Sequence, residues 1–347
     1  MNLLQKYKKY SEYYPLCDEG RREMLAAAEE ICADGRLSEE AHSFLRRLTS
    51  IADEAHFRVI ESELKERPPQ FGAFVYTLMI EEMERVYGEK AIPRDVFDAT
   101  FYDMQNEHPW MDEGPNGFGM YGFDTILHLC GETFVLGRLR FEMWHYVEET
   151  PPQVRELGLK EGDCVLDVHV PAGLAGSRKK AGSVFRIRET ATLPDIFREQ
   201  GVSRFRECEK TENANPSGLA YANPAGLAEA NPSGKLSREN CLDAFGRAKA
   251  FFPKHFGYDF KAFGCETWLF DPAFEKMLPP ESNILMFRRL FTVYKTYEDY
   301  DGLDFIFNGI TRENIKDAPR DTRLQRAVIE HMLAGGILQA GAGYRMA

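Results

Sequence analysis

The spacing of hydrophobic side chains divides this chain into two parts. In the first third, hydrophobic positions recur every three or four residues, which places them on one face of a helix. Runs of this kind cover residues 41–59, 71–86, 96–104 and 124–130. Ser38 is predicted to cap the first of these helices and Pro93 to open the third. The pattern predicts a domain of packed helices over residues 1–131.

After Gly131 the hydrophobic and polar positions alternate, which is typical of half-buried strands. The alternation is clearest at residues 139–144 and 164–170, and further strands are predicted at 260–270, 291–297, 304–307 and from Ile337 onward. Helices are predicted at 237–252, after Asp271-Pro272, and from a capping box at Thr322 to Gly335. The fold class is therefore α+β, with a mixed sheet and flanking helices over residues 132–347.

One predicted strand–turn–helix unit is interrupted. The strand 164–170 ends in Pro171-Ala-Gly173, and the helix that should follow starts far downstream at Ser237. Between them lie three tandem octapeptides at residues 214–237, whose Pro-(Ala/Ser)-Gly core echoes Pro171-Ala-Gly173. We interpret residues 174–231 as an insertion that stretched the glycine turn. Its octapeptides are predicted to be mobile or a string of Asn-Pro turns, whereas the hydrophobic residues between 183 and 205 could form a small ordered lobe. Backbone N–H groups of such a turn and a helix N-terminus together favour phosphate binding.

Composition excludes several classes of partner and site. The formal net charge of -12 disfavours nucleic acid and anionic membranes as partners. The N-terminus lacks the hydrophobic core of a signal peptide, and no stretch is long and apolar enough to span a membrane. The seven cysteines are scattered without a Cys-x-x-Cys motif. This pattern predicts reduced thiols in the cytoplasm and no zinc site.

Three residues are candidates for chemistry. His169 takes the last polar position of its strand, where it is either a base assisted by Asp167 or a packed strand-end histidine. Glu266 stands on a strand face that is otherwise apolar, as a base acting through water or as a paired structural carboxylate. Cys265 points the other way and is a candidate nucleophile only if His169 activates it.

Several segments, in order, resemble a bacterial group of acyltransferase-domain proteins. These proteins join a helical N-terminal domain to a domain like that of the GNAT acyl-CoA N-acyltransferases. The matching pieces include Leu136-Gly-Arg-Leu-Arg-Phe141, His169-Val-Pro171 and Cys265-Glu-Thr-Trp-Leu-Phe-Asp-Pro272, followed by 282–284, 322–327, His331 and Gly335-Gly336. The (Gln/Arg)-x-x-Gly-x-(Gly/Ala) loop that is usual in GNAT enzymes is missing from this sequence.

The resemblance implies acyl-CoA as co-substrate and a small-molecule amine as acceptor. It assigns the CoA pyrophosphate to the turn and the helix start, at Val170, Ala172, Gly173, Gly234, Lys235 and Ser237. A backbone N–H of the 164–170 strand would polarise the thioester carbonyl, and the amine would attack directly. His169 or Glu266 would take the amine's proton through water. A hydroxyl of Tyr294, Tyr297 or Ser282 would then protonate the leaving thiolate.

The leading hypothesis is therefore an acyl-CoA-dependent N-acyltransferase. The missing phosphate-loop motif favours an alternative, a GNAT-like protein that binds acyl-CoA or another ligand, or a partner, without turnover. A third hypothesis is a hydrolase with Cys265 as its nucleophile.

Deletion of residues 174–231 tests the insertion. We expect a well-folded product with an unchanged sheet, because an insertion within a turn adds nothing to the core. Circular dichroism and analytical size exclusion would check this expectation. An insoluble product would contradict it.

Overall fold

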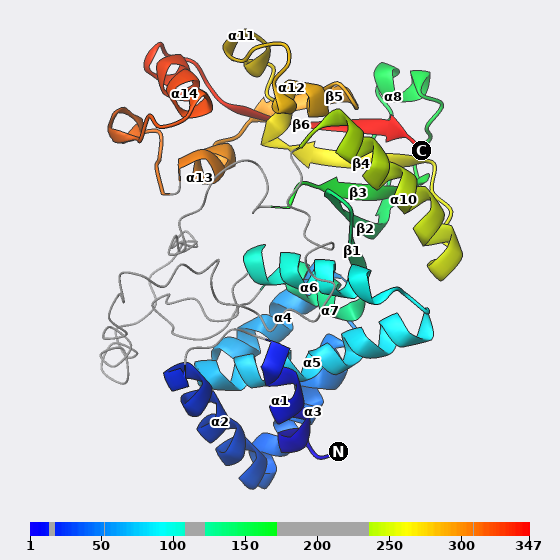
Figure 1. The fold of residues 1–347 in the computed structure, drawn as a ribbon, viewed down its shortest axis with the longest axis vertical. Coiled ribbons are helices and arrows are strands. Elements are labelled where there is room, and N and C mark those ends of the chain that lie inside the picture. Colours follow the sequence, from blue (N-terminus) through cyan, green and yellow to red (C-terminus); the bar gives the residue numbers. More distant parts are fainter. Residues whose placement is uncertain (14–17, 52, 108–121, 172–235, 308) are drawn as a thin grey trace. The chain divides into compact units, whose positions relative to one another are not determined.

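The computed structural model describes residues 1–13, 18–51, 53–107, 122–171, 236–307 and 309–347 (Figure 1). The described residues form two compact units. Of the described residues, one unit holds those in 1–91 and 104–132, and the other holds 92–103, 133–171 and those in 236–347. The predicted insertion at 174–231 and the octapeptides lie outside the described residues.

The first unit is helical, as its hydrophobic spacing predicts. Its helices are α1 (Leu3–Tyr10), α2 (Asp18–Ala33), α3 (Gly35–Leu48), α4 (Glu54–Lys65), α5 (Pro69–Glu89) and α7 (Phe123–Cys130), with a 3-10 turn η1 (Ser11–Tyr13). Helix α5 contacts the other five helices. Its residues 71–80 are all buried, which fits a helix enclosed on every side.

The prediction of one helix over residues 41–59 was wrong. Helix α3 ends at Leu48, and α4 starts at Glu54. Asp34 caps α3, so Ser38 lies inside that helix. Asp53 accepts the backbone N–H of His56 at 2.7 Å and caps α4. Two aspartate caps thus start two separate helices.

The second unit holds a six-stranded sheet in the order β1-β2-β3-β4-β6-β5. The strands are β1 (Thr133–Leu136), β2 (Leu139–Tyr146), β3 (Cys164–His169), β4 (Ala262–Thr267), β5 (Thr292–Glu298) and β6 (Gln339–Met346). Strands β3 and β4 are parallel, and every other neighbouring pair is antiparallel. The predicted mixed sheet is confirmed, although β1 was not predicted.

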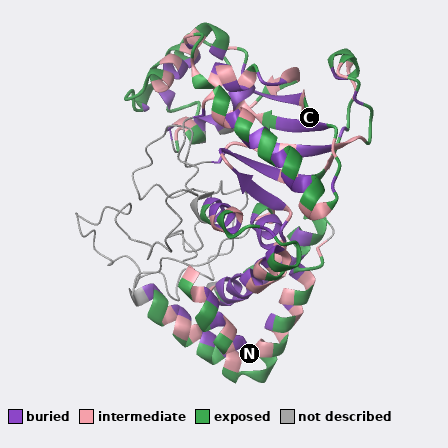
Figure 2. Ribbon diagram, turned by 45° about the vertical axis from the view of Figure 1, so that its right-hand side comes forward, coloured by how far each residue is buried: buried purple, intermediate pink, exposed green. Residues whose placement is uncertain are grey.

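Helix α10 (Arg238–Phe256) connects β3 to β4 and covers one face of the sheet (Figure 1). The ring of its Phe245 lies 4.6 Å from Phe263 on β4 and 6.1 Å from Phe141 on β2. The predicted helix start is confirmed, and Ser237 caps the helix by accepting the backbone N–H of Asn240 at 3.3 Å. In Figure 2 the strands are largely buried, and α10 carries buried and exposed residues in turn.

Helix α6 (Arg94–Glu107) begins in the sheet unit rather than in the helical unit. The buried hydroxyl of Thr100 on α6 accepts the backbone N–H of Val135 at 2.9 Å. This bond satisfies a buried donor of β1, the strand at one end of the sheet.

Two further predictions failed between β4 and β6. Residues 304–307 form part of helix α13 (Asp301–Phe307), because Leu303 and Phe307 are buried at a four-residue spacing. The predicted strand 260–270 ends at Thr267 and turns into η6 (Trp268–Phe270). The other short elements are α8 (Pro152–Glu156), α11 (Phe274–Met277), α12 (Asn283–Arg288), η7 (Ile315–Asp317) and α14 (Arg323–Leu333), whose Thr322 capping box is confirmed.

Asp271 joins the start of β6 to the turn that precedes α11. Its buried carboxylate accepts the backbone N–H groups of Ala273 at 2.8 Å and of Gln339 at 3.0 Å. The sequence predicts Asp271 as a helix cap, and this is wrong: α11 starts at Phe274 with Ala273 at its N-cap position, so the first bond closes the turn before the helix. The second bond connects residues far apart in the chain.

Asp271→Ala removes the acceptor of both N–H groups. We expect the free energy of unfolding to fall by about 2 kcal/mol or more, because buried donors lose their partner. Chemical denaturation measures this loss. Glu275→Ala is the control: its partly exposed ion pairs with Arg288 and Arg289 should contribute less than about 1 kcal/mol. Equal losses in the two variants would contradict the assignment.

Candidate functional site

The candidate site lies at the carboxyl ends of the parallel strands β3 and β4. Their pairing stops at Asp167 and Gly264. Beyond that point β3 continues to His169, while β4 continues to Thr267 and stays paired with Gly341 of β6. Since α10 runs back across the sheet between two parallel strands, its N-terminus lies at the same end (Figure 1).

Polar side chains share the sheet face that α10 leaves uncovered. Phe141 and Val168 are paired, and Phe141 packs on α10. The alternate residues Asp167 and His169 therefore lie on the opposite face. Strand β2 adds Glu142, which pairs with Asp167, and Arg140, which pairs with His169.

Three of these side chains, Asp167, His169 and Glu142, form a connected group with His145. Nε2 of His169 lies 3.1 Å from Oδ2 of Asp167 and 3.6 Å from Oε2 of Glu142. The other oxygen of Glu142 lies 2.8 Å from Nε2 of His145. A β-bulge between Glu142 and His145 brings both residues to this face. Nε2 of His169 is buried and makes no well-aligned hydrogen bond, so the two carboxylates act on it through their charge; the side chain as a whole is 32% exposed.

These contacts set the protonation of the group. Burial raises the pKa of Glu142, but the contacts with His145 and His169 lower it by more than burial raises it. The pKa therefore lies far below the usual glutamate range. Burial and Arg140 lower the pKa of His169, but Asp167 and Glu142 outweigh them and raise it to about 9. His169 is therefore an imidazolium at neutral pH. This charge argues against its predicted role as a base.

Arg140 is buried and lies beside this group on β2. Its Nη1 is 3.5 Å from Oδ2 of Asp103, a buried carboxylate on α6. The pair gives the guanidinium a negative partner on the side of α6.

Glu266 and Tyr297 meet across β6. The Tyr297 hydroxyl donates a hydrogen bond to the Glu266 carboxylate. Glu266 pairs with Ala342 and Tyr297 with Ala340, so two small side chains lie between them on the intervening strand. Of the hydroxyl candidates, Tyr297 is therefore the one in contact with a predicted catalytic residue.

The other two hydroxyl candidates have different surroundings. The ring of Tyr294 stacks on Tyr344 at 5.3 Å. Ser282 precedes α12 and makes no side-chain cap bond there. Neither contact joins them to His169 or Glu266.

Gly264 makes room between β3 and β6 on the same face. A Cβ atom there would lie 3.4 Å from the Tyr344 ring and 3.5 Å from the Asp167 carboxylate. A side chain larger than alanine would displace one of them.

The residues assigned to the CoA pyrophosphate are described only in part. Ala172, Gly173, Gly234 and Lys235 lie outside the described residues. Val170 is half-buried just beyond β3, and Ser237 caps α10.

Glu239 also lies at the α10 N-terminus. The Glu239 carboxylate accepts hydrogen bonds from its own backbone N–H and from the Ser237 hydroxyl, and both lower its pKa. An anion bound to these groups would have to displace this carboxylate.

Cys265 is buried, and burial raises the pKa of its thiol well above the ordinary value. A neutral, buried thiol is a poor nucleophile, so the structure argues against the hydrolase hypothesis.

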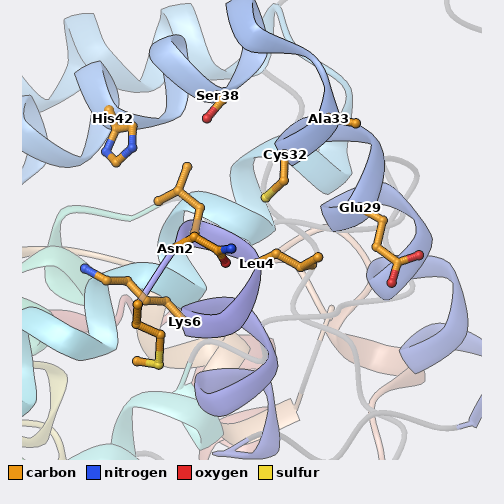
Figure 3. Close-up of a pocket in the computed structure, with 10 residues that line it drawn as sticks. Asn2, Leu4, Lys6, Glu29, Cys32, Ala33, Ser38 and His42 are labelled. Carbon is orange, nitrogen blue, oxygen red and sulfur yellow. The ribbon is translucent and has the colours of Figure 1, made fainter.

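The helical unit contains a cavity that no sequence pattern predicted (Figure 3). This cavity has a volume of about 490 Å³ and is lined mainly from α1, α2 and α3, by residues such as Leu4, Lys6, Cys32 and His42. Among the described residues, no three His, Cys, Asp or Glu side chains gather as metal ligands. No helix in the described part combines the length and hydrophobicity that crossing a membrane requires.

Comparison with protein families identifies both parts of the chain. Residues 8–127 match the N-acyltransferase N-terminal domain. Residues 230–345 match the GNAT-like C-terminal domain. The predicted resemblance is thereby confirmed. No match was found among the curated proteins.

Solved structures of an acyltransferase share the fold. The complex with decanoyl-CoA is 19% identical, with a TM-score of 0.55, and covers 95% of this chain and 88% of that chain. The complex with decanoyl-CoA and teicoplanin is 20% identical, with a TM-score of 0.54, and the match covers 98% of this chain and 93% of that chain. The complex with CoA and 10C-teicoplanin gives the same four values.

The His169 ion pairs make stability depend on pH. The folded pKa of about 9 lies above the unfolded value of roughly 6.5. The stabilisation is therefore complete below pH ~6.5 and is lost as the pH rises through ~9. The Glu142 carboxylate acts in reverse, because its folded pKa is lowered: its contribution is lost as the pH falls below ~4.

His169→Gln removes the imidazolium. We expect it to lower the free energy of unfolding by about 1–2 kcal/mol at pH 6, allowing for partial exposure, and by much less at pH 9.5. Denaturation at both pH values measures the difference. His56→Gln, at an exposed position in the helical unit, is the control. A loss that does not change with pH would show that the ion pairs contribute nothing.

Proposed function

The chain joins an N-acyltransferase N-terminal domain to a GNAT-like C-terminal domain, and from this premise we propose an acyl-CoA-dependent N-acyltransferase. The acyl group would pass from a CoA thioester to a small-molecule amine by direct attack. The solved acyltransferases of the same fold, which bind decanoyl-CoA or CoA, support acyl-CoA as co-substrate. We place the activity in the cytoplasm, in keeping with the free cysteines of the described residues.

The observation that carries this proposal is the end of pairing between β3 and β4 next to the start of α10. The thioester arm would enter where the strands part. A backbone N–H of β3 beyond Asp167 would polarise its carbonyl. The pyrophosphate would lie at the turn between Val170 and Ser237, which includes Ala172, Gly173, Gly234 and Lys235. There the N-terminus of the 19-residue α10 favours negative charge.

Glu266 fits the role of base. Its side chain is exposed beside the point where the strands part, and Tyr297 holds the carboxylate in place. It would take the proton of the attacking amine through a water molecule. His169 does not suit this role, because it already carries a proton at neutral pH.

Glu239 favours one alternative, a GNAT-like protein that binds a ligand without turnover. Its carboxylate already bonds the hydroxyl and one of the amides at the α10 N-terminus. A phosphate would have to replace it. Tight CoA binding without thiol release would support this alternative.

Thiol release from acyl-CoA in the presence of pooled amines tests the proposal. Glu266→Gln should lower kcat by about 10²–10³-fold, because the base is lost, and should leave CoA binding by calorimetry unchanged. Glu149→Gln is the matched control, since Glu149 forms a partly exposed ion pair with Lys295. If the wild-type protein releases no thiol with any amine, the proposed acyltransferase activity is wrong.

A further inference from the structure

His169 lies where an acyl transfer would occur. It is two residues past the last pair between β3 and β4, on the face that α10 leaves uncovered. Glu266 occupies the equivalent place on β4, two residues past Gly264. The two side chains therefore flank the point where the strands part.

The charged groups that surround His169 lie on β2 and β3, and a further carboxylate on α6 contacts one of them. Asp167 on its own strand and Glu142 on β2 lie within 3.6 Å of its Nε2. Arg140 on β2 is the nearby positive charge, and Asp103 on α6 lies against that guanidinium. His145 contacts Glu142 from the far side. Two carboxylates thus face one side of the imidazole.

We propose that His169 acts as a cationic general acid, and that Glu142 and Asp167 are positioning residues that fix its ring and keep it charged. This role deepens the proposed function and rests on it. The amine nitrogen forms a bond to the acyl carbon, and the bond between that carbon and the CoA sulfur breaks. The departing thiolate takes the proton of His169 Nδ1, since Nε2 faces the carboxylates. The amine's own proton goes through water to Glu266.

This assignment replaces the hydroxyl that the family resemblance implies. The Tyr297 hydroxyl already donates a hydrogen bond to Glu266 and is thereby directed at that carboxylate rather than at a leaving thiolate. An ordinary thiol has a pKa near 8.5, close to the value of about 9 for His169. Proton transfer between the two groups is therefore nearly balanced in free energy, which is the condition for efficient acid catalysis.

The first experiment is the pH dependence of kcat. Wild-type kcat should fall above pH ~9 as His169 loses its proton. Glu142→Gln should move this fall to lower pH by about one unit or more, because one of the two carboxylates is gone. Glu149→Gln, which removes a carboxylate outside the group, should not move it. A fall that stays in place in Glu142→Gln overturns the proposal and leaves the proposed function intact.

The second experiment changes the leaving group. His169→Gln should lower kcat by about 10²–10⁴-fold with acyl-CoA. It should lower kcat far less with an acyl thioester of an aromatic thiol, which departs without a proton. Equal losses with both substrates would show that His169 acts otherwise. If the wild-type protein transfers no acyl group at all, the proposed function fails, and this role fails with it.

Discussion

The candidate site depends on one constraint, the parallel pairing of β3 with β4. Parallel neighbours need a crossover, and α10 supplies it across the hydrophobic face of the sheet. The crossover brings a helix N-terminus to the carboxyl ends of both strands. Pairing on that edge ends at Asp167 and Gly264, while β4 stays fixed to β6. The strands can part there because each is held on its other side.

Sequence patterns predicted the class of fold well, since period and capping are local properties. The caps at Ser237 and Thr322 and the alternation in β3 are examples. The failures occurred where local pattern was ambiguous. Residues 304–307 are too short a run to separate strand from helix, and packing of the α13 residues Leu303 and Phe307 decided the outcome.

The sequence predicts the strand face on which each residue of the candidate site lies, but not which residues it contacts on neighbouring strands. Alternation placed His169 with Asp167. The approach of Glu142 depends on the register between β2 and β3 and on a bulge, and the sequence encodes neither locally. The contact between Glu266 and Tyr297 depends on a third strand passing between them. The sequence predicted that Asp167 raises the pKa of His169, but it did not predict the second carboxylate, Glu142, which raises it too.

Helix α6 is joined to the sheet by a hydrogen bond and an ion pair, although it precedes the sheet by more than twenty residues in the chain. A fragment cut at residue 132 would keep all six strands but lose Thr100 and Asp103. The amide of Val135 would then lose its acceptor, and Arg140 its carboxylate, beside His169. A fragment that keeps the sheet unit of this chain intact must therefore start before Ile92 and include the first part of α6.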